Sequence, residues 1–367
     1  MREFLKNTMK ILHISSEKQG WSGGAEQMFA LSCGMRDRGH TVIVGCPTGS
    51  SIEEKAVTAG FNAIVLPMFN DIDFYSAIKL AFFCRRSGID IVHAQHPRAH
   101  AVALLSSYFT RMPPLVVTRR VSFPIENNFP ARWKYINSKI KKFICVANAV
   151  KRELEKFGVP ADKLEVIYSG VNIKKFHPGE RKGESFNAPV VGSVANFSHW
   201  KGQSVFLESS RIIRNKKPEC CFLLAGRDTD SEKVKNLVNK HGIAEKTALL
   251  GFKNNVPEVM SNLTIFVCSS TGAEGLSGTL REAMAMGLPV VATDVGGNRE
   301  IVKHMETGML VPPRDPGAIA EAVIFLLDHS QDAKAMGERG RSLVSENFTT
   351  DMMVERTEKV YKKIVEA

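Results

Sequence analysis

The chain has 367 residues, of which 44% are hydrophobic and 24% are charged. At roughly 150 residues per domain, this length predicts about two globular domains. No hydrophobic run approaches the ~20 residues of a membrane-spanning helix, and the N-terminal run ILHI is too short for the core of a signal peptide. The seven cysteines include no CxxC pair, so we expect buried thiols in a cytoplasmic protein. Residues 1–8 are expected to be a loose extension.

The formal net charge of +11 is concentrated in the first half of the chain. Residues 1–172 carry 23 Lys and Arg against 14 Asp and Glu, whereas residues 173–367 carry 26 against 24. No nucleic-acid-binding motif accompanies the basic half, so we expect no nucleic-acid partner. An anionic membrane surface or a phosphorylated acceptor is the kind of partner that this charge favours.

The first half alternates short β-branched runs with helical stretches. In chain order these are KILHISS, a helix over Ala25–Arg38, TVIVGCP, a helix near Ile52, AIVLPM, a helix over Phe74–Arg86, IDIVHAQ, a helix over Ala99–Phe109, PLVVTRR, KKFICVA, a helix over Ala149–Phe157, and LEVIYSG. Strands that alternate with helices predict an α/β fold with a parallel, doubly wound sheet.

The same pattern then repeats after a polar stretch at residues 172–187. It runs through PVVGSVA, a helix over Gln203–Asn215, CCFLLAG, a helix over Glu232–His241, TALLGF, TIFVCSS, a helix over Thr279–Met286, PVVATD and three helical stretches between Pro316 and Glu366. We therefore predict two Rossmann-like domains, residues 1–172 and 173–348, which face each other across a ligand-binding cleft. The last helix, residues 349–366, is expected to pack back on the first domain.

The most informative segment is SSTGAEGLSGTLREAMAMGLPVVATDVGGNRE, residues 269–300. Glu274 lies in a loop and Glu282 lies in the helix that follows. Between them Gly275 and Gly278 allow backbone N–H groups to approach a ligand, and the unpaired N–H groups of the helix start favour an anion. This pattern predicts a diphosphate cradle flanked by two carboxylates that accept hydrogen bonds from sugar hydroxyls, as a nucleotide-sugar requires.

Two further segments fit a phosphate ligand. Gly23 and Gly24 follow the first strand and precede a helix, although a tight turn alone would also explain them. Lys201 lies just before a helix, where a cation opposes the helix dipole unless an anion binds there. The alternative for Lys201 is a solvated lysine beside a turn.

With these residues in order, nearly the whole chain resembles glycosyltransferase family 4, the retaining enzymes of the GT-B fold. The resemblance rests on GGAE, on CVANAVKRELEKFGVPADKLEVIYSGVNIKKFHP, on the pair Lys201 and Gly202, and on EGLSGTLREAMAMGLPVVATDVGGNREIV. It implies that Glu274 contacts the transferred sugar and Glu282 the ribose. It also implies a set of residues that hold the diphosphate: Gly23, Gly24, Lys201, Leu276, Ser277, Gly278 and Thr279.

The resemblance further implies that the first domain binds the acceptor and the second the nucleotide-sugar. It implies transfer of a hexosyl group, with UDP-sugars favoured, to a glycan or lipid-linked acceptor of cell-envelope polysaccharide or lipopolysaccharide. Catalysis would then rest on stabilising the leaving diphosphate, with Glu274, Lys201 and Arg120 as the catalytic residues. Two alternatives stay open, namely a nucleotide-sugar epimerase of similar fold and a non-catalytic glycan-binding subunit.

The chain departs from the family pattern at two places. Asn196 stands where family members usually carry an arginine that pairs with the phosphate-binding lysine. Arg119 and Arg120 stand where many members carry a histidine. We expect Asn196 on the donor side, and Arg119 or Arg120 to supply charge to the diphosphate or to an anionic acceptor, since a guanidinium binds phosphate in a bidentate manner. An exposed basic turn is the plain alternative.

No metal or other cofactor is expected. The DxD triplets at residues 71–73 and 228–230 each precede a helix, so capping explains them better than metal binding. His93, His96 and His100 leave a strand and enter a helix with no carboxylate in the same segment. We interpret them as core or cleft histidines, with His96 on the acceptor side.

The stretch RWKYINSKIKKF, residues 132–143, interleaves aromatic and aliphatic residues with lysines. Such a segment suits the surface of an anionic bilayer, and a solvated helix beside the core is the alternative. We therefore expect peripheral association with the inner face of the cytoplasmic membrane.

Overall fold

The computed structural model describes residues 8–18, 20–179, 188–272 and 274–367. The expected N-terminal extension falls mostly on residues 1–7, and the polar stretch between the domains falls partly on residues 180–187; both ranges lie outside the described residues. The chain divides into two compact units. The first comprises the described residues up to Arg120 together with Pro124–Gly170 and Thr350–Ala367, and the second comprises Val121–Phe123 and Val171–Thr349.

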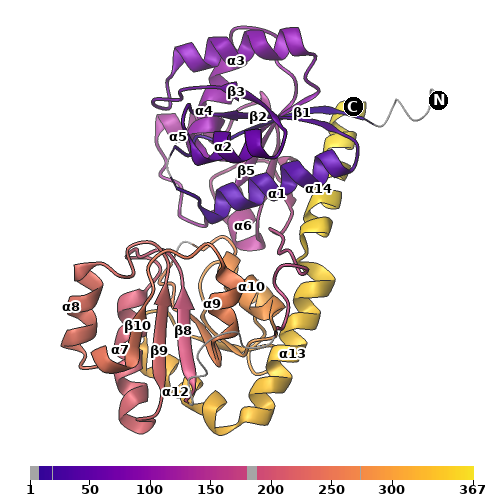
Figure 1. Ribbon diagram of the computed structural model, residues 1–367. Helices are drawn as coiled ribbons and strands as arrows, with labels where there is room; N and C mark the ends of the chain where they lie inside the picture. The colour runs from indigo at the N-terminus through magenta and orange to yellow at the C-terminus, as the bar shows by residue number, and fades with distance from the viewer. Residues whose placement is uncertain (1–7, 19, 180–187, 273) are drawn as a thin grey trace. The chain divides into compact units, whose positions relative to one another are not determined.

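The first unit is built on a parallel seven-stranded sheet of order β3-β2-β1-β4-β5-β6-β7 (Figure 1). Its strands are β1 (Lys10–Ile14), β2 (Thr41–Cys46), β3 (Asn62–Val65), β4 (Ile91–Ala94), β5 (Leu115–Arg119), β6 (Ile140–Cys145) and β7 (Leu164–Val166). Its helices are α1 (Gly23–Asp37), α2 (Ser51–Thr58), α3 (Phe74–Ser87), α4 (Pro97–Ser106), α5 (Phe129–Tyr135), α6 (Asn148–Lys156) and α14 (Thr350–Glu366).

The second unit repeats this architecture around a parallel six-stranded sheet of order β10-β9-β8-β11-β12-β13. Its strands are β8 (Val190–Val194), β9 (Cys221–Ala225), β10 (Thr247–Leu249), β11 (Ile265–Cys268), β12 (Val290–Thr293) and β13 (Met309–Val311). Its helices are α7 (Gln203–Lys216), α8 (Glu232–Lys240), α9 (Val256–Ser261), α10 (Gly278–Ala285), α11 (Asn298–Ile301), α12 (Pro316–Asp328) and α13 (Ser330–Asn347). The predicted α/β class with two Rossmann-like domains is confirmed.

The last helix packs on the first unit, as predicted, and lies beside α1 (Figure 1). A Cβ at Gly34 of α1 would lie 2.4 Å from a methyl group of Val354, so the two helices approach as closely as a glycine allows. Glu358 of α14 accepts hydrogen bonds from Arg38 at 3.0 Å and His40 at 3.2 Å. Because the Nδ1 atom of His40 accepts the Met9 N–H, the proton of this ring lies on Nε2 and faces Glu358.

Three short elements of the second unit were not predicted. Strand β13 has three residues, helix α11 has four and helix α9 has six, so none is long enough to show a clear periodic pattern. Within the described ranges, no helix combines the length and hydrophobicity needed to cross a bilayer.

The interpretation of residues 132–143 as one amphipathic membrane segment is wrong. Helix α5 ends at Tyr135, and strand β6 begins at Ile140. The side chains of Ile140 and Phe143 are fully buried in the first unit, and the ring of Tyr135 lies 6.0 Å from that of Phe143. These hydrophobic side chains therefore belong to the core and are not available to a bilayer.

Candidate active site

Lys201 and Glu274 form an ion pair in the second unit. The Nζ atom of Lys201 lies 2.6 Å from Oε1 of Glu274, and the same oxygen accepts a hydrogen bond of 2.6 Å from the Ser270 hydroxyl. The side chain of Glu274 is only 6% exposed, whereas that of Lys201 is 21% exposed. The carboxylate is thus fixed inside the unit by two donors, and the cation that neutralises it reaches solvent.

Two glycines allow the backbone to form this pair. Gly202 caps α7 in a left-handed conformation (φ 68°), and a Cβ there would lie 1.9 Å from the Ser269 carbonyl oxygen. Gly296 also has positive φ (53°), and a Cβ there would lie 1.7 Å from the Glu274 carbonyl oxygen. Any side chain at either position would push apart the loops that carry Lys201 and Glu274.

The Glu274 backbone is also held by the short segment that leaves the first sheet. Val121 forms an antiparallel bridge with Glu274, and the Ser122 hydroxyl donates a 2.8 Å hydrogen bond to the Glu274 carbonyl. Sequence reasoning did not identify Ser122, Ser270 or Gly296. The roles of Ser122 and Gly296 depend on contacts with a distant part of the chain, whereas Ser270 contacts Glu274 four residues away.

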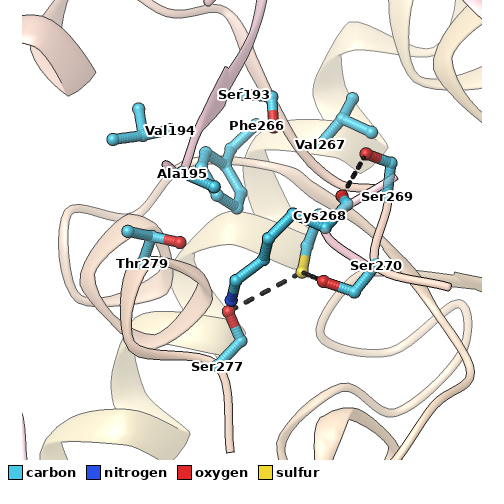
Figure 2. Close-up of a pocket in the computed structure, with 11 residues that line it drawn as sticks. Ser193, Val194, Ala195, Phe266, Val267, Cys268, Ser269, Ser270, Ser277 and Thr279 are labelled. Atoms are coloured by element: carbon cyan, nitrogen blue, oxygen red, sulfur yellow. Dashed lines mark hydrogen bonds between the residues drawn. The ribbon is translucent and has the colours of Figure 1, made fainter. Parts of the chain in front are cut away.

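A small cavity lies beside the ion pair at the carboxyl ends of β8 and β11. Its volume is about 10 Å³, room for about one water molecule, so by itself it is too small to hold a nucleotide-sugar. Figure 2 shows side chains around it, with the Cys268 thiol between Ser270 and Ser277. The lining residues are Ser193, Val194, Ala195, Lys201, Phe266, Val267, Cys268, Ser269, Ser270, Ser277 and Thr279.

Helix α10 begins at this cavity. Its N-cap residue, Ser277, makes no side-chain capping hydrogen bond, and the helix starts at Gly278 and Thr279. The first N–H groups of a helix have no partner within the helix, and with the helix dipole they favour an anion. Ser277 and Thr279 thus place the start of α10 at the same cavity as Lys201.

Glu282 lies one turn into α10 and is half-buried. Next to it Arg281 is fully buried, and its Nε donates to the Ser277 carbonyl at 3.3 Å. Burial lowers the pKa of Arg281 to about 10, while Glu282 and Glu274 act in the opposite direction. The guanidinium stays charged at neutral pH, so it adds a buried positive charge to the start of α10. Sequence reasoning missed this residue.

Asn196 is exposed at the end of β8, and its side-chain oxygen accepts the backbone N–H of Arg227 at 3.0 Å. A second backbone bond, from Phe197 N–H to the Arg227 carbonyl, fixes the same loop. The Arg227 guanidinium lies over the ring of Phe252 at 5.5 Å. Asn196 itself carries no charge, but its hydrogen bond fixes the backbone of Arg227, which follows strand β9.

In the first unit, His96, Arg120 and Gly24 come together. A Cβ at Gly24 would lie 3.0 Å from Nε2 of His96 and 3.4 Å from Cδ of Arg120, so the start of α1 touches both side chains. A Cβ at Gly23 would meet nothing within 4 Å, which leaves space next to this helix start. The structure therefore groups these predicted residues at the carboxyl edge of the first sheet.

The imidazole of His96 is held by two side chains that follow β1. Its Nδ1 atom hydrogen-bonds with the Ser15 hydroxyl at 2.8 Å, and its Nε2 atom lies 3.2 Å from Glu17. Burial raises the pKa of Glu17, but hydrogen bonds from His96 and Ser22 outweigh this effect, and its pKa lies below the ordinary value. Glu17 is thus an anion that orients His96.

Arg120 is oriented by a buried polar chain. Its Nη2 donates a 2.6 Å hydrogen bond to Oε1 of Gln95, so the amide nitrogen of Gln95 must face Nδ1 of His93, 3.0 Å away. His93 Nε2 then carries the proton toward Thr118 at 2.6 Å. The hydroxyl of Tyr361, on α14, also hydrogen-bonds with Nδ1 of His93.

Burial keeps the histidines of this core neutral. It lowers the pKa of His13 to about 3 and that of His93 well below its ordinary value, and the Arg120 charge acts in the same direction on both. The pKa of His100 also falls to about 3 because of burial, with Lys134 adding to the effect. His93 and His100 are therefore core histidines, and His96 is the partly exposed one.

Arg119 does not join this group. Neighbouring residues of a strand point to opposite faces, and the guanidinium of Arg119 donates to the Tyr135 hydroxyl at 2.6 Å and lies over its ring at 5.2 Å. Only 9% of Arg119 is exposed. That Arg119 serves the acceptor side together with Arg120 stays a prediction, and the contact with Tyr135 shows that the two arginines have different neighbours.

Two family models match the chain, and together they cover both units. The description "Glycosyltransferase Family 4" matches residues 21–175, and "Glycosyl transferases group 1" matches residues 179–343. The chain belongs to this glycosyltransferase family.

One relative of the glycosyltransferase and two solved structures show what this chain is similar to. The lipopolysaccharide core biosynthesis mannosyltransferase LpsB of Rhizobium meliloti is 30% identical over 214 residues, which are 54% of this chain and 61% of LpsB. A glycosyltransferase from Rickettsia africae superposes with a TM-score of 0.87 at 22% identity, over 98% of this chain and 99% of that one. Anabaena HepE in complex with UDP gives a TM-score of 0.84 at 20% identity, over 97% and 100%. HepE has also been solved with UDP-glucose.

The acidic triplets of the glycosyltransferase differ in their roles. Asp73 caps α3 by accepting the Ser76 N–H at 3.0 Å, as predicted. The second triplet does not cap α8, because Ser231 is the N-cap residue and makes no side-chain capping bond. Among the described residues, no group of three or more His, Cys, Asp and Glu side chains is arranged to hold a metal ion.

Proposed function

We propose that this glycosyltransferase transfers a hexosyl group, with retention of the anomeric configuration, from a nucleoside-diphosphate sugar to a glycan or lipid-linked acceptor of the cell envelope. The observation that carries the proposal is the Lys201–Glu274 pair beside the uncapped start of α10. A UDP-sugar is the favoured donor, and the HepE complexes with UDP and UDP-glucose support this choice. The relation to LpsB supports an acceptor in lipopolysaccharide or a related polysaccharide.

Lys201 and Glu274 have separate tasks in this proposal. When the donor binds, the Lys201 ammonium turns from Glu274 to the diphosphate, and the amides of Leu276, Ser277, Gly278 and Thr279 share the same charge. Glu274, still held by Ser270, then accepts hydrogen bonds from the sugar, and Glu282 accepts them from the ribose. Lys201 is suited to this exchange because its side chain is the more exposed of the pair.

The reaction breaks the bond between the anomeric carbon and the diphosphate oxygen and forms a bond from the same carbon to the acceptor oxygen on the same face. The proton of the acceptor hydroxyl passes to the departing diphosphate. Fixed positive charge at the leaving group stabilises the transition state more than the ground state. Lys201, Arg281 and the helix start supply this charge, and Glu274, still held by Ser270, accepts hydrogen bonds from the sugar and forms no bond to the anomeric carbon.

Arg227 is proposed as the second cation of the donor site. The family's usual arginine is replaced by Asn196, whose side chain holds the Arg227 backbone. An Arg227→Ala variant is expected to raise KM for the donor about tenfold, because it removes a half-buried guanidinium beside the exposed ring of Phe252. Unchanged donor KM would remove Arg227 from the site.

The group in the first unit is proposed to bind the acceptor side. Arg120 is fixed by Gln95, and His96 is fixed by Ser15 and Glu17, so both present donors at a fixed place. An anionic group, such as a phosphate of a lipid-linked acceptor, is the ligand that a guanidinium beside an imidazole suits best.

Turnover of a panel of UDP- and GDP-sugars, with and without a crude glycolipid fraction, tests this function. Transfer with retained configuration, read by NMR of the product, supports the proposal, and it should persist in excess EDTA. Interconversion of the donor sugar without transfer would instead show an epimerase, and absence of any turnover across the panel would contradict an enzymatic role. Lys216→Ala, a change at an exposed lysine of α7, is the matched control for Lys201→Ala.

A further inference from the structure

The solvent-facing side of helix α3 is hydrophobic. Its inward side is buried through Ser76, Ala77, Leu80, Ala81 and Cys84. Its outward side carries Phe74, Tyr75, Ile78 and Phe82, which are 54%, 63%, 39% and 49% exposed. A helix at the surface of a soluble protein usually turns polar residues outward, so a helix with hydrophobic residues on both sides needs a second partner.

The hydrophobic surface continues beyond the helix on both sides. Phe69 and Ile72, each 65% exposed, lie in the loop that leads into α3. Tyr108 and Phe109 follow α4, which packs beside α3, and the ring of Phe109 lies 6.3 Å from that of Phe74. We call this surface the α3 patch; it comprises Phe69, Ile72, Phe74, Tyr75, Ile78, Phe82, Tyr108 and Phe109.

Positive charges surround the α3 patch. Helix α3 contains Lys79, Arg85 and Arg86 and no acidic residue. The ammonium of Lys18 lies 5.3 Å from the centre of the Phe69 ring, and that of Lys139 lies 5.6 Å from the centre of the Tyr108 ring.

The acidic residues nearest in sequence are already engaged. Asp71 pairs with Lys134 at 3.0 Å, and Asp73 is buried as the cap of α3. The α3 patch therefore combines aromatic and aliphatic side chains with basic ones.

We propose that the α3 patch docks the glycosyltransferase on an anionic lipid bilayer. Aromatic and aliphatic side chains enter the interface between headgroups and acyl chains, and lysines and arginines at the edge contact anionic headgroups. A protein partner fits this composition less well, because the cores of protein interfaces are depleted of charged residues, lysine among them. The surface is also carried by one helix and its flanks, which suits a flat bilayer.

The α3 patch adjoins the proposed acceptor group within the first unit. Phe69 and Ile72 follow β3, and His96 and Arg120 follow β4 and β5, so all of them lie at the carboxyl edge of the same parallel sheet. Arg98, two residues after His96, donates a 3.2 Å hydrogen bond to the Met68 carbonyl and ties the two loops together. A lipid-linked acceptor anchored in the bound bilayer would thus meet the residues that bind it; this last step alone rests on the proposed function.

Flotation of the full chain with vesicles tests the docking surface without any sugar substrate. Vesicles of phosphatidylcholine and phosphatidylglycerol should bind the protein at low salt, and pure phosphatidylcholine should bind it weakly. The variant Tyr75→Ser/Ile78→Ser/Phe82→Ser should lose at least about tenfold in partitioning. The matched control, Val57→Ser/Val365→Ser, changes two other exposed hydrophobic residues, 62% and 44% exposed, and should bind normally.

Charge reversal separates the electrostatic contribution to vesicle binding from the hydrophobic one. Arg85→Glu/Arg86→Glu should weaken binding to the anionic vesicles, and Arg211→Glu/Lys216→Glu on α7 should not. The proposal is overturned if the wild-type protein fails to float with anionic vesicles, or if the triple serine variant floats as well as its control. It is also overturned if light scattering shows that the α3 patch is covered by a second copy, with a dimer that the triple variant dissolves.

The proposed glycosyl transfer and the proposed membrane docking can be contradicted independently of each other. Normal turnover of donor and detergent-dispersed acceptor by a variant that no longer floats supports the docking role and leaves the function intact. Flotation of a protein that turns over no donor supports docking and contradicts the function.

Discussion

Replacing Lys201 by methionine separates its contribution to folding from its contribution to catalysis. The Nζ–Oε1 distance is 2.6 Å, and the two side chains are 21% and 6% exposed, so the pair lies between a surface pair and a fully buried one. Surface pairs contribute ~0–1 kcal/mol, and breaking a buried pair costs ~3–5 kcal/mol, which places this loss near 2 kcal/mol. For a unit of this size, the melting temperature should fall by about 4–8 °C.

The double variant Lys201→Met/Glu274→Gln shows whether the stability lost in Lys201→Met comes from the unpaired carboxylate of Glu274. An amide at position 274 can still accept from Ser270 without a buried charge, so the double variant should recover most of the stability lost in the single one. Turnover should stay about 100-fold or more below wild type in both, because neither restores the cation at the leaving diphosphate. Calorimetry measures the melting temperature and a donor-release assay measures turnover, with Lys216→Met as the control. Full turnover by Lys201→Met, or recovery of activity in the double variant, would refute the assignment.

Three further predictions follow from the geometry of the units. Gly296→Ala should destabilise the second unit by more than about 3 kcal/mol and abolish turnover, because its Cβ would lie 1.7 Å from the Glu274 carbonyl oxygen. The control Gly179→Ala, at a site with open space, should change neither the melting temperature nor the activity. Gln95→Leu should lower kcat/KM for the acceptor while leaving donor KM unchanged, because Arg120 and His93 of the first unit lose their hydrogen bonds with Gln95. Gln95→Glu, which can still accept from Arg120, should retain part of the activity, and equal changes in both constants would contradict the positioning role. The melting temperature should fall as the pH drops below about 6.5, because the buried histidines bind fewer protons in the folded protein than in the unfolded one. Each buried histidine lowers the free energy of unfolding by about 1.4 kcal/mol per pH unit until the pH reaches its folded pKa, which is about 3 for His13. His13→Gln should flatten this slope, and a melting temperature independent of pH between 4 and 7 would show the reasoning to be wrong.

The fold was predictable because its elements are long enough to show their periods. Runs such as KILHI and CFLLA are buried strands, and α7 shows its hydrophobic residues at helical spacing. The prediction failed at residues 132–143, where interleaved lysines and aromatics suggested one amphipathic segment at a membrane surface. A turn at Asn137 divides that segment, and the strand that follows buries Phe143 in the sheet.

The candidate site was predictable in its residue types but not in its contacts. Glycines and acids at fixed spacing identified the loop of Glu274, because local spacing fixes local backbone geometry. Its pairing with Lys201 joins residues 73 positions apart, and no pattern within one segment specifies that contact. For the same reason the sequence could not distinguish Arg119 from Arg120, because the side that each faces depends on the register of β5 in the sheet.

The chain returns to its first unit only at its end, and this order has a consequence for synthesis. Tyr361 supplies the hydroxyl that joins His13 and His93, and Val354 fills the space beside Gly34, yet both emerge from the ribosome after the whole second unit. Until then the first unit has an incomplete core, in which His13 and His93 lack their hydrogen bonds with the Tyr361 hydroxyl. We therefore expect the first unit to mature last although it is made first, and nascent chains stalled before residue 350 to be sensitive to proteases in their N-terminal part.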